Sequence, residues 1–284
     1  MSLDLDARKT VTTNDGVTLR YLEAGSGRPL IMIPGWSQTV AEFRENIPAL
    51  ADQARVLAVD MRGHGESDKP RHGYRVSRLA ADLHDMIEAL DLSEVTLLGH
   101  SMGSSVAWCY LETYGADRIA GLVVVDQAPC CIAKPGWSEA QCLDYGVLMP
   151  NPQGAYDLYA MLTSPEAEAE TPGFLRGMFT DALDDDTFGF VVAENLKMPR
   201  RYGADLVFDH LHNDWRDAIA RITLPTLVIG AEASIFSAQS QRWIAGTIPG
   251  AAVDIVPAAE GGSHFMFLEN ARRFNERVGT FLAG

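Results

Sequence analysis

Six short apolar runs, spaced along most of the chain, constrain its fold more than any other feature. They lie at residues 30–33, 55–59, 95–98, 119–125, 226–229 and 252–256. The runs are continuous rather than alternating, rich in β-branched residues, and most of them end at Gly, Pro or Asp. Strands buried on both faces have this pattern, because helices cover a parallel sheet from both sides. We therefore predict that these runs form a mostly parallel sheet.

Segments with helical spacing lie between the runs. Apolar residues recur every three or four positions in 76–90, and 102–114, 239–246 and 265–281 also fit helices. Strands that alternate with helices indicate βαβ crossovers and a doubly wound α/β fold. Residues 8–24 read instead as a hairpin, with a turn at Asn14-Asp15-Gly16.

Residues 128–215 break this alternation. The stretch is rich in proline and in aromatic residues. Because it lies between two strands of one sheet, we predict a helical cap over the carboxyl edge of that sheet. The expected division is a core of residues 1–127 and 216–284 and a cap, or lid, of residues 128–215.

Composition narrows the functional classes. The chain has 284 residues, is 47% hydrophobic and carries a formal net charge of −15. That charge repels phosphate backbones and anionic lipid, so we expect neither nucleic acid nor a membrane as a partner. The acidic start, Met-Ser-Leu-Asp-Leu-Asp, lacks the features of a secretion signal, and no CxxC pair is present. We expect a cytoplasmic protein with reduced cysteines and, because the histidines lack ligand spacing, no metal.

One motif points to chemistry. Residues 99–103 read Gly-His-Ser-Met-Gly, which is a G-x-S-x-G pattern between a predicted strand and a predicted helix. A nucleophilic serine on such a sharp turn has a strained backbone and tolerates only small neighbours. The pattern predicts Ser101 as a nucleophile, with the positive end of the following helix close to a developing oxyanion.

The predicted base and acid lie at the same edge of the sheet. His264 follows the last strand and a glycine-rich loop, and loops after parallel strands converge on one edge. Asp126 ends the run 119–125, and Glu232 follows the run 226–229. We favour Asp126 as the acid that orients His264, with Glu232 as the alternative. The histidines at 64, 72, 84, 210 and 212 are interpreted as surface or locally hydrogen-bonded residues.

These motifs together resemble the α/β-hydrolase superfamily over nearly the whole chain. The resemblance rests on Gly-His-Ser-Met-Gly at 99–103, Asp-Met-Arg-Gly-His-Gly-Glu-Ser at 60–67 and Ser-His-Phe at 263–265. It implies an α/β-hydrolase fold, the triad order Ser, Asp, His, and a structural role for segment 60–67. The family usually has an acid where this chain has Ala233, which favours Asp126 as the acid.

A second departure concerns the oxyanion hole. Pro34-Gly35-Trp36 replaces the His-Gly that the family often carries after its third strand. The backbone N–H groups of Trp36 and Met102 would still serve as oxyanion donors.

The function expected from these residues is a metal-free, cofactor-free serine hydrolase of a carboxylic ester or lactone. Its substrate would be small and apolar or aromatic, and the protein a monomer or homodimer. The candidate substrate contacts are Trp36, His100, Trp137, Tyr145, Met149, Tyr159 and Phe265. Cleavage of a carbon–carbon bond by the same triad stays open.

Two alternatives remain beside this hypothesis. Pro34-Gly35-Trp36, His100-Ser101 and Asp126 also resemble the cofactor-free 2,4-dioxygenases of quinolones, in which a His/Asp dyad deprotonates a hydroxylated heteroaromatic ring. In that case Ser101 would only bind substrate. A slow-turnover small-molecule receptor would keep the same triad.

Overall fold

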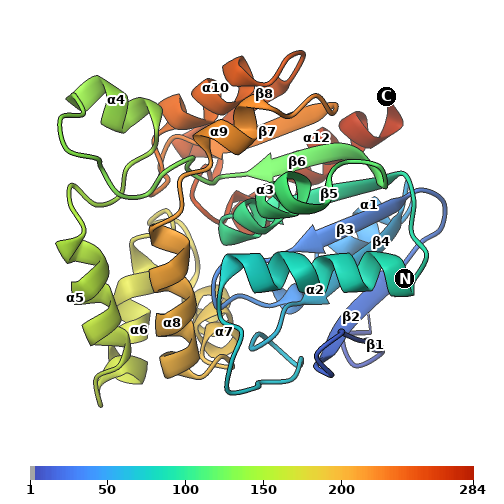
Figure 1. The fold of residues 1–284 in the computed structure, drawn as a ribbon, viewed down its shortest axis with the longest axis horizontal. Coiled ribbons are helices and arrows are strands. Elements are labelled where there is room, and N and C mark those ends of the chain that lie inside the picture. Colours follow the sequence, from blue (N-terminus) through green and yellow to red (C-terminus); the bar gives the residue numbers. More distant parts are fainter. Residues whose placement is uncertain (1–3) are drawn as a thin grey trace.

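An eight-stranded sheet runs through the centre of the computed structural model, which describes residues 4–284. Its strand order is β1-β2-β4-β3-β5-β6-β7-β8 (Figure 1). The strands are β1 (Lys9–Thr12), β2 (Thr18–Ala24), β3 (Pro29–Ile33), β4 (Arg55–Asp60), β5 (Val95–His100), β6 (Ile119–Val125), β7 (Thr226–Ala231) and β8 (Ala252–Val256). The β1–β2 hairpin joins the sheet antiparallel to β4, and the other pairings are parallel. The predicted mostly parallel sheet is confirmed.

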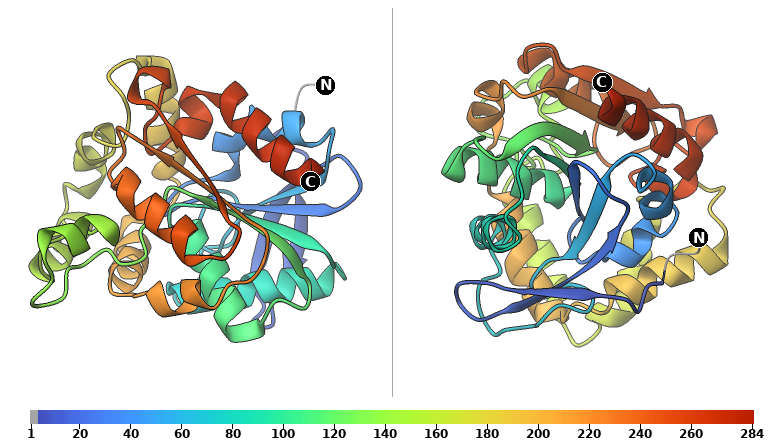
Figure 2. Two further views of the ribbon diagram at one scale, coloured as in Figure 1. Left: turned by 90° about the horizontal axis from the view of Figure 1, so that it is seen from above. Right: turned by 90° about the vertical axis from the view of Figure 1, so that its right-hand side faces the viewer.

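Helices cover both faces of this sheet (Figure 2). One face carries α2 (Val76–Ala89), α3 (Met102–Tyr114), α9 (Arg216–Ala220) and α10 (Ala238–Thr247), and the other carries α1 (Asn46–Leu50) and α12 (Ala271–Ala283). Successive side chains of a strand point to opposite faces. Ile31 therefore packs in the core under α2 and α3, and Leu30 in the core under α1 and α12. Burial on both faces explains why the strand sequences do not alternate between apolar and polar residues.

The predicted single helix at 265–281 is wrong, because the chain forms two helices there. α11 (Met266–Glu269) and α12 are separated by Asn270, whose backbone is not helical (φ −140°, ψ 61°). The Asn270 side chain accepts a hydrogen bond from the Arg273 backbone N–H at 3.2 Å. Asn is a preferred residue for capping a helix start in this way. Upstream, the short 3₁₀ helix η2 (Ala258–Glu260) leads out of β8.

The segment between β6 and β7 carries five further helices. These are α4 (Glu139–Asp144), α5 (Gln153–Leu162), α6 (Ala167–Arg176), α7 (Asp185–Asn195) and α8 (Arg200–Leu211), and they lie beyond the carboxyl ends of the strands (Figure 1). The two ends of the segment lie side by side, since the Trp215 N–H donates to the Pro129 carbonyl at 2.8 Å. This arrangement supports the division into a core and a cap of residues 128–215, which stays a prediction.

Segment 60–67 ties neighbouring elements to the end of β4. One Asp60 carboxylate oxygen accepts from the backbone N–H of Val40, in the 3₁₀ helix η1 (Val40–Phe43), at 2.9 Å. The other accepts from the Glu66 backbone N–H and from the Arg8 guanidinium, each at 3.0 Å. A Cβ at Gly65 would lie 2.3 Å from the Asp60 carboxylate, so only glycine fits there. These contacts support the structural role expected for the segment.

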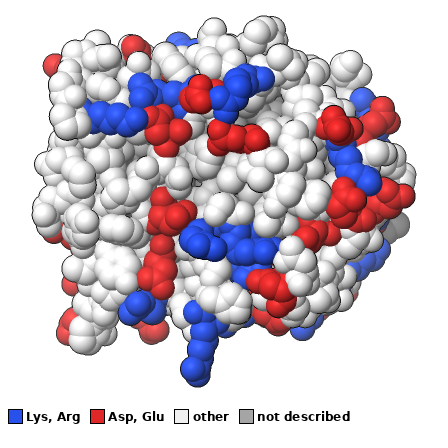
Figure 3. Space-filling view, viewed as in Figure 1, with Lys and Arg blue, Asp and Glu red and all other residues white. Residues whose placement is uncertain are grey.

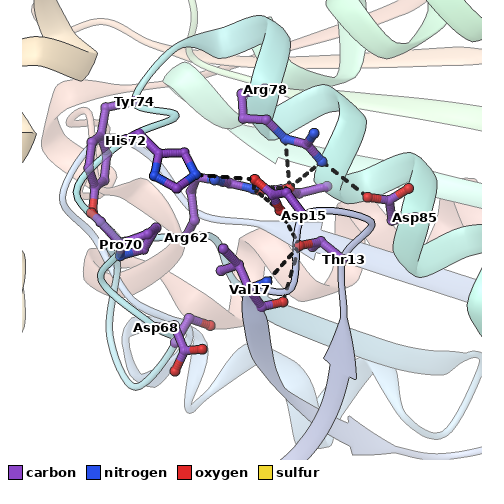
Figure 4. A network of polar contacts seen from close by, with 12 residues as sticks. Thr13, Asp15, Val17, Arg62, Asp68, Pro70, His72, Tyr74, Arg78 and Asp85 are labelled. Carbon is purple, nitrogen blue, oxygen red and sulfur yellow. Dashed lines mark hydrogen bonds and ion pairs between the residues drawn. The ribbon is translucent and has the colours of Figure 1, made fainter.

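Arg62, in the same segment, is fully buried and links the β1–β2 turn to α2 (Figure 4). Its Nε lies 2.5 Å from one Asp82 oxygen and its Nη2 2.6 Å from the other. Nη2 also contacts both Asp15 oxygens at 3.0 Å, and Arg78 donates to Asp82 at 2.8 Å. Buried charges of this kind must be paired, because an isolated one is costly.

Acidic and basic side chains lie next to one another on the face drawn in Figure 3. Within the described chain, the exposed side chains of Arg221 and Glu112 form one ion pair at 2.6 Å. Exposed pairs of this kind contribute little to stability. Among residues 4–284, no helix combines the length and the apolar character needed to cross a bilayer.

Candidate active site

Ser101 occupies a strained turn between β5 and α3. Its backbone lies at φ 51° and ψ −127°, a region that non-glycine residues rarely adopt. A Cβ at Gly103 would lie 2.3 Å from the Ile33 carbonyl oxygen, and one at Gly99 would lie 2.4 Å from the Gly103 carbonyl carbon. Both positions therefore require glycine, which is the steric condition that the G-x-S-x-G pattern expresses.

His264 and Asp126 form a buried pair at the same edge of the sheet. His264 Nδ1 lies 2.6 Å from Asp126 Oδ2, and the two residues are 2% and 0% exposed. Nδ1 has the carboxylate as its acceptor, so in the neutral ring Nδ1 carries the proton and Nε2 is free to accept one. Ser101 and His264 line one cavity. The structure thus places Ser101 beside the same cavity as an imidazole that Asp126 orients.

Burial shifts both members of the pair toward their neutral forms. It lowers the pKa of His264, because the charged imidazolium is poorly solvated there. It raises the pKa of Asp126, while the hydrogen bond from Ser234 acts in the opposite direction. A neutral imidazole is the form that can act as a general base.

Glu232, the alternative acid, points elsewhere. It is exposed, and its Oε2 accepts a hydrogen bond from the Ala258 backbone N–H at 3.1 Å. The structure thus brings Asp126, and not Glu232, to the His264 ring.

Ser234 is a residue of the site that the sequence reasoning missed. Its Oγ donates to the Asp126 oxygen that also contacts His264, and it accepts from the Phe236 backbone N–H at 3.1 Å. The loop after β7 is held there by a bridge between Ala233 and Ser263. The sequence carries a signal for this loop. The family usually has its acid at the position of Ala233, so the loop that holds Ala233 and Ser234 is expected to face His264.

The loop after β3 lies directly against Ser101. A Cβ at Gly35 would be 3.0 Å from the Ser101 Cβ. Within the described chain, the Trp36 backbone N–H has no hydrogen-bond partner, and the Met102 N–H begins a helix and so has no intrahelical acceptor. The Trp36 side chain lines the cavity, and its Nε1 donates to the Gly203 carbonyl of α8 at 2.7 Å. Neither backbone N–H group is taken up by another acceptor within the described residues, and their role as oxyanion donors stays a prediction.

His100 does not line the cavity and is wholly buried beneath it, so its expected substrate contact is corrected. Its Nε2 lies 2.8 Å from the His264 carbonyl oxygen and its Nδ1 lies 2.8 Å from Gln38 Oε1. Gln38 Oε1 also accepts from the Gly35 N–H at 2.9 Å. His100 and Gln38 therefore connect the loop after β3 to the segment that carries His264.

The cavity over Ser101 has a volume of about 290 Å³ and lies between the sheet edge and the inserted helices. Of the predicted substrate contacts, it brings together Trp36 and Met149. Most of the other lining residues are apolar and were not predicted: Leu148, Leu158, Phe174, Leu175, Met178, Val207, Leu211, Ile235 and Phe236. His210 also lines the cavity, which corrects its interpretation as a surface or locally bonded residue.

The remaining predicted contacts lie outside this cavity. Trp137 and Tyr145 pack against each other with ring centroids 4.8 Å apart, and Arg216 covers both rings. Tyr159 donates to Asp205 at 2.9 Å and lines a separate, open groove of about 670 Å³ that does not reach Ser101. Phe265 is fully buried and stacks on Phe179 at 4.3 Å. None of these four rings lines the cavity over Ser101, so their expected substrate contacts are corrected.

Comparison with known proteins identifies the family of this fold. Residues 28–271 match the family model of the alpha/beta hydrolase fold. A soluble epoxide hydrolase of Corynebacterium sp. (strain C12) is 38% identical over 115 residues, and this match spans 40% of each protein's length. The bromoperoxidase from Bacillus anthracis superposes with a TM-score of 0.88 at 25% identity, covering 98% of this chain and 100% of the other.

An esterase from Exiguobacterium antarcticum shares the fold with a TM-score of 0.87 at 23% identity, covering 97% of this chain and 99% of the other. The family model spans most of the sequence, including the turn at Ser101, Asp126 and His264. The chain belongs to the alpha/beta hydrolase family.

Proposed function

We propose that this protein is a serine hydrolase that cleaves small, largely apolar carboxylic esters or lactones through an acyl-enzyme. The observation that carries the proposal is the 2.6 Å contact of Asp126 with His264 Nδ1, next to a cavity that also holds the strained Ser101. This contact leaves Nε2 of a neutral ring as the proton acceptor. The hydrolase membership and the similarity to an esterase fold support it.

In the first half of the reaction, the Ser101 hydroxyl oxygen attacks the substrate carbonyl carbon while His264 Nε2 accepts the hydroxyl proton. The Trp36 and Met102 backbone N–H groups donate to the resulting oxyanion. The tetrahedral intermediate collapses when its carbon–oxygen bond to the alcohol breaks and His264 returns the proton to that alcohol. Water then attacks the acyl-enzyme in the same way and releases the carboxylic acid and Ser101.

The cavity supports a small apolar substrate. Its volume of about 290 Å³ lies near the lower end for ligand pockets, and its walls are mostly Leu, Met, Phe and Val side chains. We propose residues 128–215 as the cap that decides the substrate, because α5, α6 and α8 contribute much of this wall.

The test is a panel of p-nitrophenyl esters of increasing chain length together with aliphatic lactones. We expect hydrolysis that Ser101→Ala lowers by about 10³-fold or more. Styrene oxide, and bromide with hydrogen peroxide, belong in the same panel because of the names of two relatives. Ester hydrolysis that survives in purified Ser101→Ala would contradict the proposal, as would turnover of the epoxide alone.

A further inference from the structure

Two polar side chains of the cavity over Ser101 have no part in the proposed mechanism: Gln38, whose oxygen accepts from the Gly35 N–H, and His210. His210 lies in the last turn of α8 and is 6% exposed. Val207, His210 and Leu211 are spaced three and four positions apart, so they share one face of the helix, and all three line the cavity. His210 is thus presented to the cavity by the same helix face as its apolar neighbours.

The imidazole of His210 has no partner in the described chain. Its Nδ1 is buried without a hydrogen bond, and no hydrogen bond of its Nε2 is found among residues 4–284. A buried polar group without a partner is costly and uncommon. The other buried histidines of the site differ in this respect, since His100 and His264 have partners for their side chains.

The other side chains that segment 128–215 contributes to the cavity wall are apolar. Among the side chains that the described part of segment 128–215 contributes to the cavity, His210 alone carries an N–H or O–H group. Burial lowers its pKa to about 4, and no charged neighbour adds to that shift. The ring is therefore neutral at neutral pH and offers one donor and one acceptor, but no positive charge.

We propose that His210 is a substrate-binding residue that hydrogen-bonds an uncharged polar group, such as a ketone, amide or hydroxyl, on the otherwise apolar part of the substrate. This inference rests on the proposed function and names the substrate class of the same site. The substrate has a scissile carbonyl at Ser101 and an apolar chain, with one polar group placed to meet the cap at α8. A carboxylate is not expected there, because the cavity wall offers it no cation.

The first experiment compares p-nitrophenyl heptanoate with its keto derivatives, in which the ketone stands at successive carbons of the chain. For at least one ketone position, we expect kcat/KM about three- to tenfold above that of the plain ester, as for one net hydrogen bond. In His210→Leu this preference should fall to about one, and His210→Gln should retain part of it. Val207→Ala is the matched control, because it reshapes the same helix face without removing a polar group and should keep the preference.

The second experiment measures binding without turnover. In the Ser101→Ala background, methyl ketones of the same chain length, with and without the second ketone, are titrated against ¹⁵N-histidine-labelled protein. The second ketone should tighten binding by the same factor and shift the His210 ring resonances, and His210→Leu should abolish both effects.

The possible outcomes distinguish the proposed hydrolysis at Ser101 from the proposed binding role of His210. No preference for any ketone position, or a preference that His210→Leu preserves, overturns the role of His210. If no ester is hydrolysed but the binding preference depends on His210, the proposed hydrolysis fails while the polar contact stands. His210→Leu removes only an unpartnered polar group, so it should fold, and its melting temperature checks this directly.

Discussion

Replacement of Asp126 by Asn tests the acid of the site, and its effect can be worked out from the contacts around the carboxylate. Asp126 Oδ2 contacts both His264 Nδ1 and Ser234 Oγ, whereas Oδ1 is buried without a partner. An amide can be placed there in two ways. With its oxygen at the Oδ2 position, the NH₂ group replaces Oδ1 and is left without an acceptor, at a cost of about 1–3 kcal/mol.

The reversed amide avoids this cost. Its NH₂ group then faces His264 Nδ1 and the Ser234 hydroxyl, which can both accept. His264 is thereby held with its proton on Nε2, the tautomer that cannot accept a proton from Ser101. A preference of about 1–3 kcal/mol leaves the productive tautomer in about one molecule in six to one in 160.

Loss of the carboxylate charge beside the developing imidazolium adds to this tautomer effect. We therefore expect Asp126→Asn to lower kcat by about 10² to 10⁴, with an unchanged melting temperature. Steady-state hydrolysis of a p-nitrophenyl ester measures the effect. Glu232→Gln is the matched control and should stay within about threefold of wild type. An Asp126→Asn enzyme that is folded and within about tenfold of wild type would refute the reasoning.

Three further outcomes follow from buried charges and rings. Arg62→Met should cost about 3–5 kcal/mol of unfolding free energy in urea, and a loss below about 1 kcal/mol would show that the buried pair is not needed. Adding Asp82→Leu should recover only part of the loss, because Asp15 and Arg78 then each lack one partner. Burial lowers the pKa of His264, so kcat/KM should fall with decreasing pH only below about 6.5, and an acid limb above 7 would contradict its role as a buried neutral base. His210 has a pKa of about 4 in the folded chain against about 6.5 in the unfolded chain, so the free energy of unfolding falls as pH drops through that window. His210→Leu should make the free energy of unfolding less dependent on pH by about 1.4 kcal/mol per pH unit, measured by urea unfolding at pH 6 and 5.

The sheet was predictable because its strands are buried on both faces. A strand such as Ile119–Val125 must be apolar at every position when α3 covers one side and α12 the other, and this leaves a continuous run in the sequence. The turn at Ser101 was predictable for a steric reason, since Gly99 and Gly103 have no room for a side chain.

The cavity wall was not predictable in the same way. Trp137 and Tyr145 follow β6 closely in the sequence, but this closeness does not determine which way a ring points, and both pack under Arg216. His210 lies far from the strands in the sequence and reaches the cavity only because α8 folds back over Trp36. Such contacts depend on how helices pack, which leaves no local signature.

The central claim is that Ser101 attacks a carbonyl carbon with His264 as its base. The most direct measurement is the mass of the intact protein after reaction with a fluorophosphonate, followed by peptide mapping of the modified residue. We expect one adduct per chain on Ser101, none in Ser101→Ala, and slow labelling in His264→Ala, because the hydroxyl is then no longer activated. A wild-type protein that stays unlabelled, or that carries the adduct on another residue, would contradict the account.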